Sequence, residues 1–402
     1  MYHGAQISAR LLLWLIGLRV AWWAVSAEDA FNITSSAETL QCLHQCICLS
    51  SKQVLCNTGG LKEIPTTLNA GVEDLSLSKN DFSVIESDAF KSLRSLRKLS
   101  LDYNNISVIK PFAFRGLTML TDLSIQYTPL SYIGQYSFAM LHNVTLILLA
   151  HNKIEYIEEY SFAGTSYIKW ILLSDNPLVT IHSRAFSGLN NVERLIFPSG
   201  IRKIEPDAFN SLSNVGFLKF TFMDLSNLLP FTFRGLSHVQ VLNIQESDLG
   251  VIKPDAFNGS EHIDNLNLLN NKIDAIQELK FTPENAIGVV RFHGNHVLRS
   301  PRAKDTSLRI HSISAENNFF PCDCQIHELF DSDFTNGSVH EFRRKNYCIS
   351  PLEYNGHVMS SIDFDLIAKC HDKVVQDNLG SSAASSMRNF LILVLSIFYI
   401  IQ

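Results

Sequence analysis

Residues 96–114 read LRKLSLDYNNISVIKPFAF, and this spacing of leucine, asparagine and phenylalanine recurs along the chain. Leu99 and Leu101 lie two residues apart, so both side chains face the same side of a short strand. Asn104 follows three residues later, where its amide can bond backbone groups that a turn leaves open. Phe114 comes where the chain returns and fills the far side of the same core layer. Each unit therefore predicts a strand, a turn and a return segment around one apolar layer.

A phenylalanine at this position returns at steps of 24 residues, with a single step of 23. The positions are Phe90, Phe114, Phe138, Phe162, Phe186, Phe209, Phe233, Phe257 and Phe281. A fixed period of this length predicts a stack of identical supersecondary units rather than a globule with one central core. Such a stack offers one long surface and few enclosed pockets, and its repeated side chains have a structural role.

These motifs resemble the leucine-rich repeat in its extracellular 24-residue form, over roughly residues 42–370. The resemblance implies an α/β solenoid shaped as a curved horseshoe. Parallel strands would line the concave face, loops or 3₁₀ turns the convex face, and disulfide caps would close both ends. We assign about ten repeats to residues 72–309.

The asparagine position departs from the pattern in the middle of the chain. It is occupied by Thr128, Gly200, Met223 and Ser247, and the sixth repeat is one residue short. Glycine and methionine have no side-chain amide that could complete the turn. We therefore expect the local curvature or twist to change near residues 200–225.

All eight cysteines lie outside the repeats, in two clusters of four. Their spacing alone permits three pairings in each cluster, and short cysteine spacings also occur in zinc sites. With the residues around them, both clusters resemble the caps of extracellular leucine-rich repeat proteins, which cover the apolar ends of the stack. The resemblance implies the disulfides Cys42–Cys48, Cys46–Cys56, Cys322–Cys348 and Cys324–Cys370. We assign residues 28–71 to an N-terminal segment and cap, and residues 310–371 to a C-terminal cap.

The N-terminus, residues 1–27, has the pattern of a secretory signal peptide. Residues 11–24 are almost wholly apolar, and Val25-Ser26-Ala27 provides small residues for a cut after Ala27. Arg19 interrupts the apolar run, so an uncleaved anchor is the alternative. Five Asn-x-Ser/Thr sequons follow as candidate glycosylation sites, at Asn32, Asn105, Asn143, Asn258 and Asn336. These signals indicate an oxidising compartment, which favours disulfides over zinc at the cysteines.

The C-terminus has the pattern of a glycolipid-anchor signal. The spacer at 372–389 contains small residues at 380–386 and continues as a polar stretch through Asn389, and residues 390–402 are mostly apolar. This apolar run is shorter than the roughly 20 residues that a membrane-spanning helix needs. We expect lipid attachment at Gly380 or Ser381. A short single-pass anchor and simple secretion are the alternatives.

No motif in the sequence indicates catalysis. There is no glycine-rich phosphate loop, no Gly-x-Ser-x-Gly elbow and no His-Glu-x-x-His, and the fourteen histidines are scattered. The net charge of −6 is spread along the chain, with no basic stripe of the kind that binds nucleic acid. We therefore expect no enzyme activity, no cofactor, no metal site and no nucleic-acid partner.

The predicted strands of repeats four to eight carry apolar residues at positions that face solvent in this architecture. One position across adjacent strands gives the row Leu146, Trp170, Arg194, Phe217 and Val241, with Tyr103, Tyr127 and His151 at its flank. The candidate ligand-binding residues are Tyr127, Leu146, Leu148, Trp170, Leu172, Arg194, Ile196, Phe217, Phe222 and Val241. Exposed apolar surface of this extent marks an interaction site. Cover by a neighbouring loop, or a slip of register in repeats six and seven, are the alternatives.

These observations favour a glycosylated, lipid-anchored protein of the outer cell surface that recognises or adheres to another protein through its concave face. A secreted matrix or growth-factor-binding protein and an immune recognition receptor are the alternatives. The sequence does not identify the ligand or the oligomeric state.

Overall fold

The computed structural model describes residues 42–281, 286–308 and 312–370. Several predicted features lie outside these residues, namely the signal peptide at 1–27, Asn32, Gly380, Ser381, the spacer at 372–389 and the apolar end at 390–402. The compact unit that begins at Cys42 contains every described residue.

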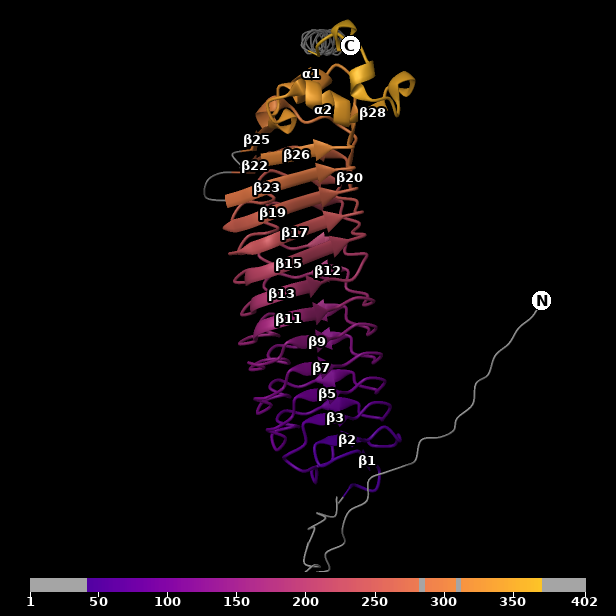
Figure 1. Ribbon diagram of the computed structural model, residues 1–402, viewed down its shortest axis with the longest axis vertical. Coiled ribbons are helices and arrows are strands. Elements are labelled where there is room, and N and C mark those ends of the chain that lie inside the picture. Colours follow the sequence, from indigo (N-terminus) through magenta and orange to yellow (C-terminus); the bar gives the residue numbers. More distant parts are fainter. Residues whose placement is uncertain (1–41, 282–285, 309–311, 371–402) are drawn as a thin grey trace, which may run out of the picture. The chain divides into compact units, whose positions relative to one another are not determined.

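One thirteen-stranded sheet runs through the described chain, and its strands follow one another in sequence order (Figure 1). All neighbours are parallel except the first pair, β1 and β2. The strands are β1 (Ile47–Cys48), β2 (Gln53–Leu55), β3 (Asp74–Ser76), β5 (Lys98–Ser100), β7 (Asp122–Ser124), β9 (Leu146–Leu148), β11 (Ser166–Leu172), β13 (Asn190–Ile196), β15 (Ser213–Thr221), β17 (Val239–Gln245), β19 (His262–Leu269), β23 (Ala286–His293) and β26 (Ser312–Glu316). The predicted solenoid of parallel strands is confirmed.

The return side of each coil is built from turns and very short strands rather than helices. These strands are β4 (Val84–Ile85), β6 (Val108–Ile109), β8 (Tyr132–Ile133), β10 (Tyr156–Ile157), β12 (Thr180–Ile181), β14 (Lys203–Ile204), β16 (Asn227–Leu228), β18 (Val251–Ile252), β20 (Lys272–Ile273), β21 (Ala275–Ile276), β22 (Leu279–Phe281), β24 (His296–Val297), β25 (Thr306–Leu308), β27 (Phe319–Pro321) and β28 (Tyr347–Ser350). Among the described residues, α-helix occurs only in the C-terminal cap, as α1 (Ile326–Phe330) and α2 (Val339–Lys345). Single 3₁₀ turns are η1 (Ala303–Asp305), η2 (Asp333–Thr335), η3 (Leu352–Tyr354), η4 (Met359–Ser361) and η5 (Phe364–Leu366).

The repeated phenylalanines form one continuous buried column. Phe90, Phe114 and Phe138 stack with ring centroids 5.8 and 5.7 Å apart and with planes 8° from parallel. The column continues coil by coil to Phe257, and Phe281 ends it with an edge-on contact at 5.8 Å. Burial of each ring stabilises the stack by about 2–3 kcal/mol.

A ladder of buried asparagines joins the coils on the other side of the core. Asn104 Nδ2 donates to Leu101 O in its own coil at 2.8 Å and to Leu77 O in the preceding coil at 2.9 Å. Asn80, Asn152, Asn176, Asn271, Asn295 and Asn318 likewise donate to carbonyls of the preceding coil. Each amide thereby satisfies backbone acceptors that the turn leaves open.

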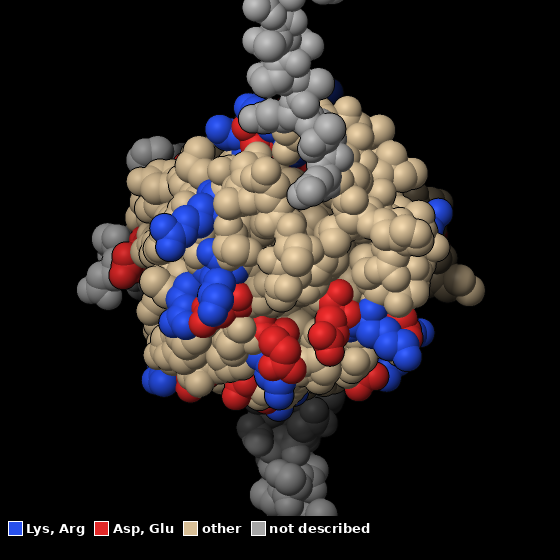
Figure 2. Space-filling view, turned by 90° about the horizontal axis from the view of Figure 1, so that it is seen from below, with Lys and Arg blue, Asp and Glu red and all other residues tan. Residues whose placement is uncertain are grey.

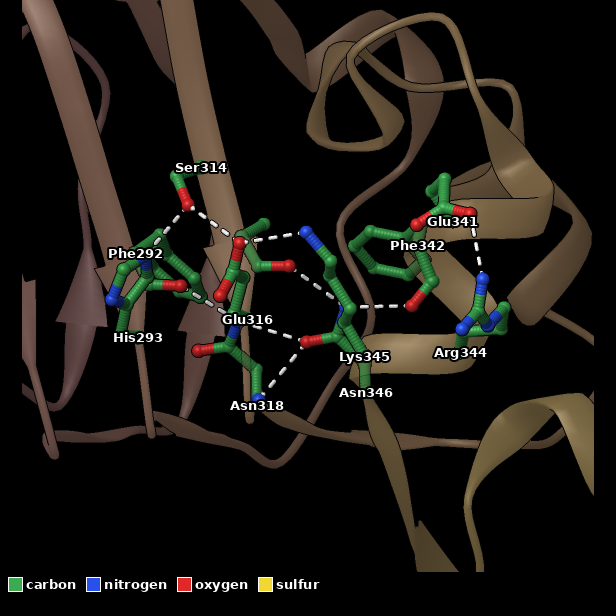
Figure 3. Close-up of polar contacts among 11 residues, drawn as sticks. Phe292, His293, Ser314, Glu316, Asn318, Glu341, Phe342, Arg344, Lys345 and Asn346 are labelled. Carbon is green, nitrogen blue, oxygen red and sulfur yellow. Dashed lines mark hydrogen bonds and ion pairs between the residues drawn. The ribbon is translucent and has the colours of Figure 1, made fainter.

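The C-terminal cap ends this ladder with a residue of its own, as Figure 3 shows. Asn346, directly after α2, donates to Ala315 O at 2.9 Å and to Phe342 O at 2.8 Å. Its side-chain oxygen accepts from Asn318 N at 2.9 Å. Beside it, Lys345 donates to Glu316 at 2.9 Å, and this hydrogen bond lowers the pKa of the glutamate. The cap therefore continues the hydrogen bonding of the repeats before it closes the stack.

The ladder is interrupted at Thr128, whose hydroxyl donates to Asn152, and over a longer stretch between Asn176 and Asn271, where the sequence departs from the pattern. Met223 N donates instead to Ser247 Oγ at 3.0 Å, and Gly200 N donates to Phe222 O at 2.8 Å. The strands lengthen in this region, from three residues in β9 to nine in β15. The altered structure near residues 200–225 thus takes the form of longer strand pairing, while a change of curvature or twist stays a prediction.

Four disulfides close the two ends. The structure pairs Cys42 with Cys48, Cys46 with Cys56, Cys322 with Cys348 and Cys324 with Cys370. These are the pairs that the resemblance implies.

Candidate binding surface

The five residues of the predicted row lie side by side on adjacent strands. Trp170 pairs with Leu146 on one side and Arg194 on the other, and Phe217 pairs with Arg194 and Val241. The register does not slip at the short sixth repeat. We call these five residues the central row.

A second apolar row runs parallel to the central row, two residues further along each strand. Leu172 pairs with Leu148 and Ile196, and Lys219 on β15 follows Ile196. All three apolar side chains are half-buried, because the surrounding strands cover only part of them. The predicted residues Leu148, Leu172 and Ile196 therefore adjoin the central row and widen it into a patch.

Along each strand, side chains that point into the core are interspersed with side chains that point to solvent, and this explains why the two rows are exposed. In β11, Ile168 and Ile171 are buried in the core, while Trp170 between them stays 38% exposed. The neighbouring inward residues Leu195 and Leu218 are buried in the same way. The core therefore uses its own set of apolar residues, and the two rows are additional apolar surface.

Trp170 and Arg194 form the centre of this surface. The Arg194 guanidinium carbon lies 4.8 Å from the centre of the Trp170 ring, which is a cation–π arrangement. Glu193 Oε1 lies 3.8 Å from Arg194 Nε. Since both large side chains hold each other in place, part of the entropy lost on binding is already lost in the free protein.

A shallow pocket of about 320 Å³ opens beside this pair. Its walls come from three adjacent strands, β13, β15 and β17, and its lining residues are Glu193, Arg194, Gly216, Phe217, Gln240 and Val241. Gly216 leaves the floor open, and the strands pass so closely there that a Cβ atom would lie 2.7 Å from Glu193 O. The pocket gives the surface a recess in which a partner side chain can be held.

An aromatic ladder lies at the ends of the strands that precede this surface. Tyr103 and Tyr127 stack with ring centroids 4.4 Å apart, and Tyr127 stacks on His151 at 4.6 Å. His151 Nδ1 lies 3.4 Å from Asp175, which ends the ladder. Partial burial and the adjacent Tyr127 raise the pKa of Tyr103. The ladder remains accessible to solvent, since Tyr127 is 45% exposed.

Phe222 does not join this ladder. It is 58% exposed and occupies the equivalent position after β15, with φ of 52°. Asp175 and the coil that contains Gly200 lie between it and His151, since Gly200 N donates to Phe222 O. The structure thus brings nine of the ten predicted binding residues into two rows and their flanking ladder, and sets Phe222 apart.

The first strands present a different surface. Asp74, Lys98 and Asp122 continue the line of the central row toward the N-terminal cap. Nearby, Lys52 lies 2.7 Å from Glu73 and lowers its pKa. Figure 2, which views the molecule from this end, shows basic and acidic side chains next to one another on the visible face. This part of the sheet is therefore polar and lacks the apolar rows.

Four of the five sequons lie in described residues, and their asparagines are exposed. Asn143 precedes β9 by three residues, and its Nδ2 donates to Thr118 O at 2.6 Å. Asn105 follows the ladder residue Asn104, while Asn258 and Asn336 lie further along the chain. All four are therefore accessible as glycosylation sites. No helix in the described part of the chain is long and apolar enough to cross a membrane.

One side-chain cluster was not predicted from the sequence. His238, His262 and Asp264 bring their ligating atoms within 4.8 Å of one another. The available signal was the separation of 24 residues between the two histidines, which is one repeat. Each histidine alone resembles an ordinary surface residue.

Two leucine-rich repeat profiles match the chain, and together they cover residues 70–320. The profile described as "Leucine rich repeat" matches residues 70–130 and 118–178. The profile described as "BspA type Leucine rich repeat region (6 copies)" matches residues 155–287 and 218–320. No curated protein sequence matches the chain.

Several solved structures are similar in fold. A chain of the octameric complex of Latrophilin 3, Unc5D and FLRT2, in which FLRT2 contributes the leucine-rich repeats, has 18% identity and a TM-score of 0.52, with 81% of this chain and 99% of that chain covered. Human 5T4, also called trophoblast glycoprotein, has 19% identity and a TM-score of 0.40, with coverage of 82% and 99%. The TLR13–ssRNA13 complex has 20% identity and a TM-score of 0.46, and this chain spans 46% of that longer chain.

Proposed function

We propose that this chain, which belongs to the leucine-rich repeat family, is a recognition protein of the outer cell surface that binds another protein through the two apolar rows. The observation that carries the proposal is the unbroken register of Leu146, Trp170, Arg194, Phe217 and Val241 on neighbouring strands. A patch of this kind on a folded domain, outside the core, is typical of a protein–protein contact.

The chemistry of the patch indicates where its binding energy lies. Tryptophan, tyrosine and arginine are the residues that dominate binding energy in protein interfaces. Trp170 and Arg194 are already stacked on each other, and the pocket beside Phe217 offers a recess for an apolar side chain. Arg194 and Lys219 add positive charge, which would favour a partner with carboxylates around an apolar centre.

Glycosylation would restrict the approach of this partner. A glycan on Asn143, three residues before β9, would stand at the N-terminal boundary of the patch, and a glycan on Asn105 would lie among the polar coils. The partner would then contact the strands from β11 to β17. This placement is part of the proposal.

The experiment replaces Trp170 and Phe217 together with alanine. The purified protein is first screened against an array of cell-surface ectodomains, and the affinity of the double variant for the partner so identified is then measured. We expect a loss of about 100-fold or more, since each hot-spot side chain contributes about 2 kcal/mol or more.

The matched control is the double variant Lys98→Ala, Asp122→Ala, which changes the same strand position in the polar coils. It should bind like the parent protein. Equal affinity of the parent and the Trp170→Ala, Phe217→Ala variant, with both folded, would place the binding site elsewhere.

We also propose that a glycolipid attached at Gly380 or Ser381 holds the protein on the membrane. The basis is the sequence pattern of small residues, spacer and apolar end. Treatment of intact cells with a phosphatidylinositol-specific phospholipase should release the protein into the medium. Retention after treatment would favour a peptide anchor, and protein found in the medium without treatment would favour the secreted alternative.

A further inference from the structure

Two histidines and an aspartate meet on the surface of the sheet, beside the end of the central row. His262 Nε2 lies 2.7 Å from one carboxylate oxygen of Asp264, and His238 Nε2 lies 3.6 Å from the other. The two imidazole rings are 5.1 Å apart. One ligating atom from each residue lies within 4.8 Å of the others. We call these three residues the His–His–Asp cluster.

The repeat brings the three residues together. Val239 pairs with Ile263 across β17 and β19, so the preceding residues, His238 and His262, occupy equivalent places in consecutive coils. Neighbouring strands lie about 4.8 Å apart, which sets the distance between the rings. Asp264 follows His262 by two residues and therefore faces the same side of the strand.

The backbone beneath the cluster is held on both sides. Val239 and Ile263 are fully buried, and His238 O accepts a hydrogen bond from Val215 N at 2.8 Å. On the following strand, the residue beside Asp264 is Gly288, where a Cβ atom would lie 2.7 Å from Asp264 O. Because Gly288 has no side chain, nothing from that residue covers the carboxylate, and the cluster stays open to solvent.

We propose that the His–His–Asp cluster binds a divalent transition-metal ion, with Zn²⁺ as the best fit. Two imidazoles and one carboxylate are ligands that Zn²⁺ accepts, whereas Ca²⁺ and Mg²⁺ prefer oxygen ligands alone. Tetrahedral ligands at about 2.0–2.1 Å from zinc lie about 3.3 Å from one another. Rotation of exposed side chains is sufficient to bring the present spacing to that value.

The third ligand distinguishes this cluster from other histidine–carboxylate pairs in the described residues. His151 with Asp175, His182 with Glu205 and His340 with Glu341 each place one histidine against one carboxylate. Those pairs offer two ligands and have the geometry of simple surface contacts. Only the His–His–Asp cluster forms a group of three among residues 42–281, 286–308 and 312–370.

The position of the cluster suggests how the ion is used. Three protein ligands leave one position of a tetrahedral site for water or for a side chain of another molecule. Asp264 is followed by Asn265, which pairs with Val241 and so continues the central row. The cluster therefore lies next to the end of the apolar surface.

The experiment measures Zn²⁺ binding by isothermal titration calorimetry, with the purified protein first freed of metal by a chelator. We expect saturable binding of one ion per chain. The variant His262→Ala should weaken the affinity at least ten-fold, and His238→Ala should do the same. Tetrahedral coordination should also give the bound Co²⁺ form its visible absorption bands. All eight cysteines are in disulfides, so thiolates do not compete.

The matched control is His340→Ala, which removes the histidine of a two-ligand pair and should leave binding unchanged. CaCl₂ titrated in place of zinc should give no saturable binding. The absence of saturable zinc binding, its persistence in the double variant His238→Ala, His262→Ala, or equally tight binding of Ca²⁺ would each overturn the proposal. Because the side chains are exposed, unchanged thermal unfolding of the metal-free variants serves as the check on folding.

Discussion

The coils before residue 166 and those from 166 to 269 share one period but are joined differently. The early coils have three-residue strands, and buried asparagines such as Asn104 and Asn152 donate to the preceding coil, with Thr128 as the exception. The middle coils have strands of seven to nine residues and place Gly200, Met223 and Ser247 where the asparagine would be. A repeat of fixed length therefore does not require one fixed set of hydrogen bonds.

The middle coils gain aromatic packing where they lose the ladder. Phe197 and Phe220 stack on each other at 4.8 Å and lie edge-on to Phe209 in the main column. The strand pairing also extends further, to Phe220 with Ile244 and Thr221 with Gln245. Two different repeat profiles match the two regions, over 70–178 and 155–320. Longer strands and additional phenylalanines thus replace side-chain amides as the links between coils.

The largest expected effect comes from the aromatic packing of the middle coils. Phe209 contacts Phe186, Phe197, Phe220 and Phe233, whereas Phe114 in the early coils contacts Phe90 and Phe138 in the column. Phe209→Ala should lower the free energy of unfolding by about 3–5 kcal/mol. The loss of free energy of unfolding for Phe114→Ala should lie near the lower end of that range. Urea unfolding followed by circular dichroism measures both.

These two variants test whether the stability of the middle coils depends more on phenylalanine packing than the stability of the early coils does. Both phenylalanines are fully buried, so exposure does not separate them. A greater loss for Phe114→Ala than for Phe209→Ala would show that the additional ring pair does not strengthen the middle of the stack.

A smaller change in the free energy of unfolding is expected when side-chain hydrogen bonds between coils are removed. Asn152 donates to Ile125 O at 2.7 Å and Leu149 O at 2.9 Å, and accepts from Thr128 N at 2.8 Å. Asn152→Ala leaves these buried groups unpaired and should lower the free energy of unfolding by about 2–3 kcal/mol. Urea unfolding followed by circular dichroism measures this change in the free energy of unfolding.

Ser247→Ala is the matching change in the middle coils. The Ser247 hydroxyl accepts from Met223 N at 3.0 Å and donates to Gln245 O at 2.8 Å. Ser247→Ala leaves fewer groups unpaired than Asn152→Ala does, so we expect the free energy of unfolding to fall by about 1 kcal/mol. Equal losses for the two variants would mean that the middle coils still depend on side-chain hydrogen bonds as the early coils do.

The smallest effect concerns a feature that both regions share. Arg234 donates to Asp207, and Arg115 donates to Asp88, at equivalent positions of the return side. In each pair the arginine lowers the pKa of the aspartate. A lowered folded-state pKa contributes stability above the unfolded value of about 3.9, and this stability is lost as the pH falls through the folded value.

Asp207→Asn should therefore lower stability at pH 7 by at most about 1 kcal/mol, since the pair is partly exposed. The difference from the parent should shrink as the pH falls below about 5 and through the lowered folded-state pKa of Asp207, and Asp88→Asn should change in the same direction. Urea midpoints across this range measure the effect. A difference that stays constant with pH would show that the charge of Asp207 is not its source.

The regular part of the fold was predictable from the sequence because inward positions repeat. The period of Phe90 to Phe257 and the Leu99–Leu101 spacing set the register, and this register placed Arg194 between Trp170 and Phe217. The same reasoning missed the His–His–Asp cluster and did not predict that Phe222 lies apart from the aromatic ladder. These two features depend on which exposed side chains meet between coils, and the core pattern does not determine those contacts.

The asparagine ladder also sets the unit by which such a chain can grow through gene duplication. Asn176 Nδ2 donates both to its own coil, at Leu173 O, and to the preceding coil, at Leu149 O. Insertion of part of a coil would break such bonds, whereas a whole duplicated coil reproduces them. Between Asn176 and Asn271 the ladder is interrupted, and a coil inserted there would have to reproduce the longer strand pairing and the ring contacts of Phe197 and Phe220 instead.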